Sequence, residues 1–195
     1  MKFGIFGYIR VLKFPQKCGT ISLYSVLGVI VLLIEKLIEA AVEYDRGDPK
    51  RIQHFIKVHS FAALIGKSEK LSADEQLVLE AAAVLHDIGI KNAERIHGSA
   101  SGKYQEIEGV PVAEEMLRKF GCSGDFISEV CYLVGHHHSY AEDISHSLRI
   151  LMEADFLVNA YEDSMSENAI ISVRNKLFRS DCGTILLNKM FDLEE

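Results

Sequence analysis

From Leu33 onward, apolar residues recur every three or four positions, which is the spacing of one face of an α-helix. The first such face comprises Leu33, Ile34, Leu37, Ile38, Ala41 and Val42. No stretch of convincing length alternates apolar and polar residues as a half-buried strand would. The sequence therefore predicts an all-α domain of about six to eight helices, without an internal repeat.

Turn and capping residues divide this region into helices. Gly47-Asp48-Pro49 ends one helix and starts the next, with Asp48 as N-cap and Pro49 in the first turn. Ser72 with Glu75, and Ser164 with Glu167, have the spacing of a capping box. The loops are predicted at residues 66–71, 89–103, 121–124 and 139–147.

The first 32 residues differ from the rest, and we treat them as an N-terminal extension to a domain spanning 33–195. A basic segment runs to Thr20, and a mainly apolar run of 14 residues follows from Ile21 to Ile34. A membrane-spanning helix needs about 20 predominantly apolar residues, so membrane contact through residues 1–34 is not favoured. A weak membrane-associated segment and a non-native segment, translated from a misplaced start codon, both stay open.

Charge limits the partners that this chain can bind. Residues 1–34 contain four of the 21 basic residues and no acid, which leaves 17 basic against 28 acidic residues in 35–195. Such a surface repels nucleic acid backbones, so nonspecific binding to DNA or RNA is not expected. The four cysteines form no C-x-x-C pair, which favours reduced thiols in a cytoplasmic protein. The eight histidines, by contrast, suggest a metal site.

Four predicted helices direct a histidine or an aspartate toward the interior. His54 and Asp155 lie within apolar stripes, the pair His86-Asp87 follows a third stripe, and His137 extends a fourth. A single histidine on an apolar face is usually a hydrogen-bonded core residue. A carboxylate such as Asp155 among apolar residues needs a cation or several donors to stay ionised. The joint occurrence of these residues therefore favours a shared polar site.

These residues resemble the successive motifs of the HD phosphohydrolase superfamily. The matching segments are 51–58 (RIQHFIKV), 83–89 (AVLHDIG), 134–138 (VGHHH) and 152–155 (MEAD). The resemblance covers roughly residues 33–195. It implies an HD-domain helical bundle in which His54, His86, Asp87 and Asp155 bind a divalent metal ion.

Such a ligand set suits particular metals and reactions. Mixed imidazole and carboxylate ligands favour Mn, Fe, Co, Ni or Zn, and Mg stays an alternative. Four protein ligands leave one or two positions open for water and a phosphoryl oxygen. The residue types do not decide whether Asp87 only binds the metal or also activates the water.

The resemblance also bears on the number of metal ions. His136 and His137 match a double-histidine motif that supplies further ligands in two-metal members and contacts phosphate in one-metal members, and the helical stripe favours His137 as the inward residue. Two-metal members have another histidine where Gln105 stands here, so one ion is favoured, with Glu106 as an unproven substitute ligand. His138 is interpreted as a solvated loop histidine.

Further candidates for substrate binding are His136, Lys91, Lys103 and Gln105. Residues 98–103 superficially resemble a phosphate-binding loop, but the spacing is one residue short and no strand precedes it. Lys103 is nevertheless a candidate because loops often carry binding residues. Lys91 follows the His-Asp pair closely, and a solvated lysine is the simpler interpretation.

We therefore expect a metal-dependent phosphohydrolase acting on a phosphate mono- or diester, such as a small nucleotide or related metabolite, with Asp87 and His137 as catalytic residues. Two alternatives stay open: a two-iron oxygenase on the same helical frame, and a non-catalytic ligand-sensing module. Substrate identity and oligomeric state are not fixed by the sequence, and a homo-oligomer is compatible with it.

Overall fold

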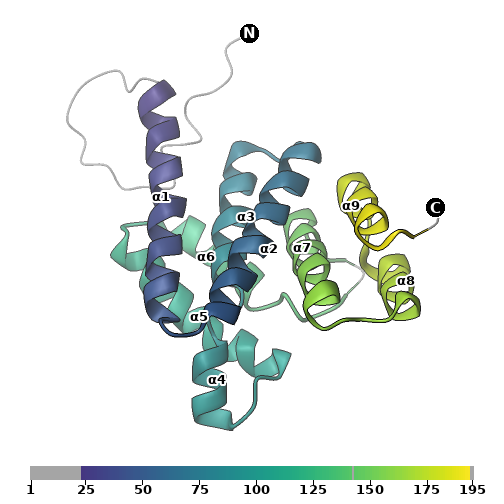
Figure 1. Cartoon of the computed structure of the whole chain (residues 1–195). Helices are drawn as coiled ribbons and strands as arrows, with labels where there is room; N and C mark the ends of the chain where they lie inside the picture. The colour runs from purple at the N-terminus through teal and green to yellow at the C-terminus, as the bar shows by residue number, and fades with distance from the viewer. Residues whose placement is uncertain (1–22, 142, 194–195) are drawn as a thin grey trace.

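The computed structural model describes residues 23–141 and 143–193, with side chains from Leu32 onward. These residues form nine α-helices and no strand, which confirms the all-α class (Figure 1). The helices are α1 (Leu23–Tyr44), α2 (Pro49–Ser68), α3 (Ala73–Leu85), α4 (Ile90–His97), α5 (Gly102–Lys119), α6 (Gly124–Val134), α7 (His146–Glu162), α8 (Glu167–Leu177) and α9 (Asp181–Phe191).

The helix count exceeds the expected six to eight partly because α4 lies inside the segment 89–103, which was predicted to be a loop. Its apolar residues Ile90, Ala93 and Ile96 recur every third position, but a helix of eight residues is shorter than the stretch over which helical periodicity is read. Gly98 ends α4 in the left-handed conformation, with φ of 63°, which glycine adopts without steric cost.

Two of the three predicted helix starts are confirmed. Asp48 accepts a hydrogen bond from the backbone N–H of Arg51 at 3.1 Å, and Ser72 forms the expected capping box with Glu75. The predicted capping box at Ser164 is wrong, because α8 begins two residues later with Ser166 as its N-cap. Ser164 instead belongs to the turn that ends α7, where its N–H donates to the carbonyl of Tyr161.

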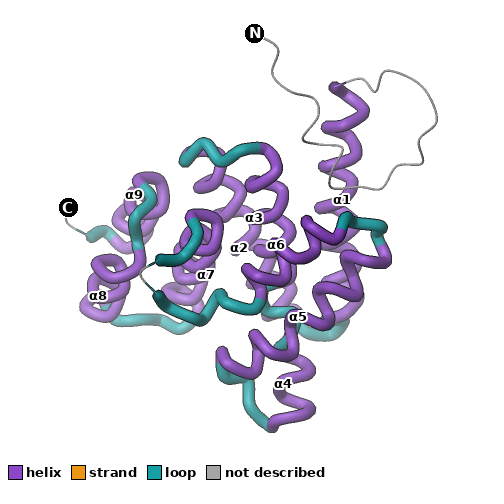
Figure 2. The backbone as a smooth tube through the Cα atoms, turned by 180° about the vertical axis from the view of Figure 1, so that it is seen from behind, coloured by secondary structure: helices purple, strands orange, loops and turns teal. Residues whose placement is uncertain are grey.

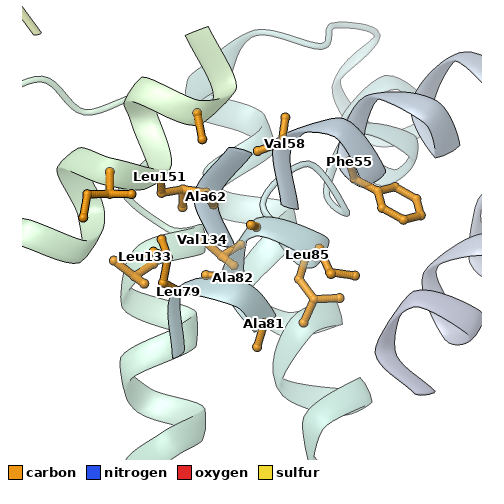
Figure 3. Close-up of a cluster of buried hydrophobic side chains, with 14 of the residues drawn as sticks. Phe55, Val58, Ala62, Leu79, Ala81, Ala82, Leu85, Leu133, Val134 and Leu151 are labelled. Carbon is orange, nitrogen blue, oxygen red and sulfur yellow. The ribbon is translucent and has the colours of Figure 1, made fainter. Parts of the chain in front are cut away.

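The core forms around α2, which packs against α3 on one side and α7 on the other, while α6 packs against α3. Figure 3 shows how side chains of these four helices meet. Ala62, Ala81 and Ala82 are fully buried, and such small side chains let helix backbones approach closely. The ends of α3 and α6 and the middles of α2 and α7 are thereby brought together.

Helix α1 packs mainly against α3, and its N-terminal end extends clear of the other helices in both views (Figures 1 and 2). It begins at Leu23 and runs without interruption across the predicted boundary between residues 32 and 33. Residues 1–22 lie outside the described residues. The prediction of a membrane-associated or non-native segment therefore stays a prediction for them. Within the described residues, no helix has both the length and the apolar character needed to cross a bilayer.

Candidate metal centre

Five side chains predicted from the helical stripes meet in the interior. His54 lies on α2 and Asp155 on α7, while His86 and Asp87 follow the last residue of α3 and His137 follows the end of α6. The three histidines and Asp155 are buried, and Asp87 is partly exposed. The fold therefore gathers these residues from four helices that are far apart in the sequence.

The ligand atoms of the four residues predicted to bind metal lie within a few ångströms of one another. The Nε2 atom of His54 lies 3.3 Å from Nε2 of His86 and 3.1 Å from Oδ1 of Asp155. Oδ2 of Asp87 is 3.5 Å from both of these Nε2 atoms. Oδ1 of Asp87 faces the other way and lies 3.5 Å from Nε2 of His137. His54, His86, Asp87, His137 and Asp155 together form the cluster.

Hydrogen bonds outside the cluster orient all three imidazoles. The Nδ1–H groups of His86 and His137 each donate to the backbone carbonyl three residues earlier, at 2.9 and 2.8 Å. Nδ1 of His54 lies 3.1 Å from Oε2 of Glu162. With Nδ1 occupied in this way, each ring turns its Nε2 lone pair toward the cluster. Three lone pairs and two carboxylates thus converge without a donor among them.

This arrangement fits a bound cation. Two Nε2 lone pairs 3.3 Å apart repel one another unless a proton or a metal ion lies between them. His54, His86 and Asp87 place one ligand atom each within 4.8 Å of one another, which a single ion can bridge. Nε2 of His137 is buried and has no hydrogen-bond partner among the described residues. Imidazole and carboxylate together are ligands of transition metals.

The electrostatics of the cluster lead to the same conclusion. Burial alone would lower the pKa of His86, but Asp87 and Asp155 raise that pKa to about 9. Burial opposes ionisation of Asp87, yet His86 and His137 hold the pKa of Asp87 at about 2. The pKa of Asp155 is also lowered, against its burial, by His54 and His86. Without a metal the site would hold protons, which a cation would displace.

His138 is not the solvated loop histidine that the sequence suggested. Its ring lies 4.0 Å from that of His137, and its Nε2–H donates to Oε1 of Gln105 at 2.7 Å. Its backbone N–H donates to Glu106, so this carboxylate anchors the loop. Asp87, His137 and His138 form a second group whose ligand atoms lie within 4.8 Å of one another. Buried Gln105 is also fixed by its bond to the carbonyl of Ala100.

Three of the four predicted substrate-binding residues lie outside this arrangement. His136 is exposed and turns away, donating from Nδ1 to the carbonyl of Tyr132 at 2.7 Å. Lys91 donates to the carbonyl of Tyr44 at 2.8 Å. Lys103 is exposed on the first turn of α5. The structure therefore places only Gln105 of this set beside the cluster.

An open pocket of about 400 Å³ lies over the cluster. Its lining includes Gln105 and His138, together with two cationic residues, Lys50 and Arg51, from the first turn of α2. Arg51 also pairs with Glu94 of α4 at 2.7 Å. These two cations were not predicted from the sequence, although they lie four and three residues before His54, on the same face of a helix.

Two residues of α7 that support the cluster were also missed. Asn159 donates to Oδ1 of Asp155 at 2.9 Å, and Glu162 binds both His54 and Lys57. Asp155, Asn159 and Glu162 are spaced by four and three residues, so they share a helix face. Extending the stripe beyond Asp155 to polar residues would have identified them.

Gly89 allows the segment after His86-Asp87 to lie directly on α5. A Cβ atom added at Gly89 would lie closer than 3.0 Å to backbone atoms of Gln105 and Gly109. Glycine is therefore required here because a larger side chain would clash with α5. Its φ of −76° is one that any residue can adopt.

Comparison with known proteins agrees with this architecture. The family model of the HD domain matches residues 51–160, which contain every residue of the cluster. The fold is similar to the crystal structure of a predicted HD superfamily hydrolase from an uncultured Thermotogales bacterium. That similarity has a TM-score of 0.57 and 23% sequence identity, and it covers 88% of this chain and 92% of the other. A search of curated proteins found no match. Because the family model covers more than half of the sequence, the chain belongs to the HD domain family.

Proposed function

We propose that this protein is a metal-dependent phosphohydrolase that cleaves a small phosphate mono- or diester, such as a nucleotide or related metabolite. The observation that carries the proposal is the convergence of three imidazole Nε2 atoms and two carboxylates beneath an open pocket. The similarity to a structure described as an HD superfamily hydrolase supports hydrolysis.

His54, His86, Asp87 and Asp155 would hold one divalent ion. When bound, such an ion polarises a phosphoryl oxygen and makes a nearby water more acidic. Glu162 and Asn159 orient two of these side chains from α7. Lys50 and Arg51 line the pocket together with several carboxylates, and Arg51 is paired with Asp48 and Glu94. These cations therefore offset only part of the repulsion between an anionic substrate and the site, and the metal ion would supply the rest.

Asp87 and His137 are the residues that we assign to proton transfer. Nε2 of His137 is a buried acceptor without a partner among the described residues, and Asp87 lies 3.5 Å from it. The attacking water forms a bond from its oxygen to phosphorus as the bond from phosphorus to the leaving oxygen breaks. Its proton passes to Nε2 of His137 and from there to the leaving oxygen.

The test is a screen of nucleotides and phosphorylated metabolites with Mn²⁺, Co²⁺, Ni²⁺ and Mg²⁺, followed by variants. His86→Ala and Asp87→Ala are expected to abolish both metal content and hydrolysis of the substrate found. His136→Ala is the matched control, because this neighbouring imidazole faces away from the cluster. Full hydrolysis by metal-free Asp87→Ala protein would refute the proposal.

A further inference from the structure

A second pocket has a volume of about 960 Å³, more than twice that of the pocket over the cluster. Its lining residues come from the loop between α6 and α7, the first turn of α7, and the end of α8 with the residues that follow. It shares no lining residue with the pocket over the cluster. Nothing in the proposed hydrolysis uses it.

Positive charge is concentrated in this second pocket. Arg149, Lys176 and Arg179 line it, and no carboxylate does so among the described residues. This is a local exception in a chain whose net charge is −7. Neither Lys176 nor Arg179 lies within ion-pair distance of a carboxylate in residues 32–141 and 143–193.

The position of Arg179 is fixed by the backbone. Its guanidinium donates through Nη1 to the carbonyls of Phe178 and Asn175, at 2.6 and 3.3 Å. Its own backbone N–H donates to the buried carboxylate of Glu153, which also binds Ser180. These bonds hold the cation at the pocket wall without neutralising it, which is what a preformed anion site requires.

Apart from the three cationic residues and Asn175, the pocket is lined by apolar and aromatic residues. Ile144, Val173 and Leu177 contribute aliphatic surface, and the side chain of Tyr140 is exposed. An exposed phenol ring beside aliphatic groups offers a flat surface against which an aromatic ring can stack. The volume is within the range of small-molecule sites.

We infer that this second pocket binds a small organic anion with an aromatic body, its charge held by Lys176 and Arg179 and its ring packed against Tyr140. Nucleotides and aromatic sulfonates or carboxylates share this chemistry. The two pockets share no lining residue, and binding of such an anion does not require the proposed hydrolysis.

The test uses 8-anilinonaphthalene-1-sulfonate, an aromatic anion that fluoresces in apolar surroundings and has no phosphate ester to hydrolyse. The chain of 195 residues is titrated with the dye in EDTA, and saturable binding at one site is expected. The double variant Lys176→Glu/Arg179→Glu should weaken binding at least tenfold, because two attractions become repulsions. The control Lys189→Glu, an exposed lysine on α9, should bind as the wild type does.

Two further measurements distinguish binding in the second pocket from binding at the cluster and from uptake by apolar surface alone. His86→Ala should bind the dye normally, whereas loss of binding there would show that the dye reports on the cluster and would refute the second site. AMP should compete at least tenfold better than adenosine if charge recognition matters. Equal binding by the charge-reversed and wild-type proteins, or no saturable binding at 1 mM dye, would also overturn the inference.

If the double variant has an altered circular dichroism spectrum, the single variant Lys176→Met replaces it. Lys176 is exposed, so this change should leave folding intact. Its dye affinity is expected to fall severalfold, and the wild-type affinity should fall as salt increases. An affinity insensitive to both changes would refute recognition of charge.

Discussion

The Nδ1 atom of His54 lies 3.1 Å from a carboxylate oxygen of Glu162, on the side of the imidazole opposite the cluster. Glu162 therefore acts as a positioning residue that keeps Nε2 of His54 directed inward. Removing such a partner typically lowers metal affinity about 10- to 100-fold. We expect this loss in Glu162→Ala, measured by competition with a chelator.

The conservative variant separates positioning from general destabilisation. Glu162→Gln retains an oxygen that accepts from Nδ1–H, so it should recover much of the affinity lost in Glu162→Ala. Glu167→Ala, at the exposed start of α8, is the control and should keep wild-type affinity. Unchanged affinity in Glu162→Ala would mean that the packing of α2 alone orients His54.

Much of the cluster was predictable because its residues interrupt apolar stripes. His54 and Asp155 occupy positions where the period of the helix demands burial, so the sequence alone indicates that they face inward. The contact of His137 with Asp87 was not predicted, because it depends on the packing of α3 against α6, which only the structure shows.

The positions of His138 and Lys91 could not be predicted from the sequence, because both depend on the loops between helices. His138 donates hydrogen bonds to Gln105 and Glu106, which lie more than 30 positions earlier in the chain. No local sequence pattern predicts contacts between residues so far apart. Lys91 was a candidate for substrate binding because it follows Asp87 closely, but it contacts the backbone of Tyr44 on α1. The direction of a side chain in a loop or short helix depends on its tertiary contacts, which helical periodicity does not predict.

Gly89→Ala is expected to destabilise the protein. The added methyl group would meet backbone atoms of α5 rather than a flexible side chain, so the two segments must separate. Overpacking of this kind costs about 1–3 kcal/mol, or several degrees in melting temperature. Gly124→Ala is the matched control, since a Cβ there meets no atom within 4 Å. Equal melting temperatures for both variants would contradict the close approach at Gly89.

Asp45→Asn should stabilise the protein at neutral pH and have no effect in acid. Burial raises the pKa of Asp45 to about 6, although Arg51 and Lys91 oppose the rise. Because the folded-state pKa lies above the unfolded value near 3.8, the ionised carboxylate costs stability as pH rises between these values, and the cost is complete above about 6. Two pKa units correspond to an upper value of about 3 kcal/mol.

Thermal unfolding from pH 4 to pH 8 measures this effect. The gain in melting temperature from Asp45→Asn should be absent near pH 4, grow through pH 5 and 6, and level off above pH 7. Asp143→Asn, an exposed aspartate in the loop before α7, should show no such trend. A gain that is the same at all pH values would refute the raised pKa as its cause.

Metal content tests the proposal of one ion against the two-iron alternative. Protein loaded with Mn²⁺ and freed of unbound metal should contain about one ion per chain by elemental analysis, and His54→Ala about none. His138→Ala should retain the ion, because Nε2 of His138 is engaged by Gln105 rather than directed at the cluster. Gln105→His restores the imidazole that the two-metal pattern requires, so its content should rise toward two. A wild-type content near two that falls to one in His138→Ala would instead assign the second ion to Asp87, His137 and His138.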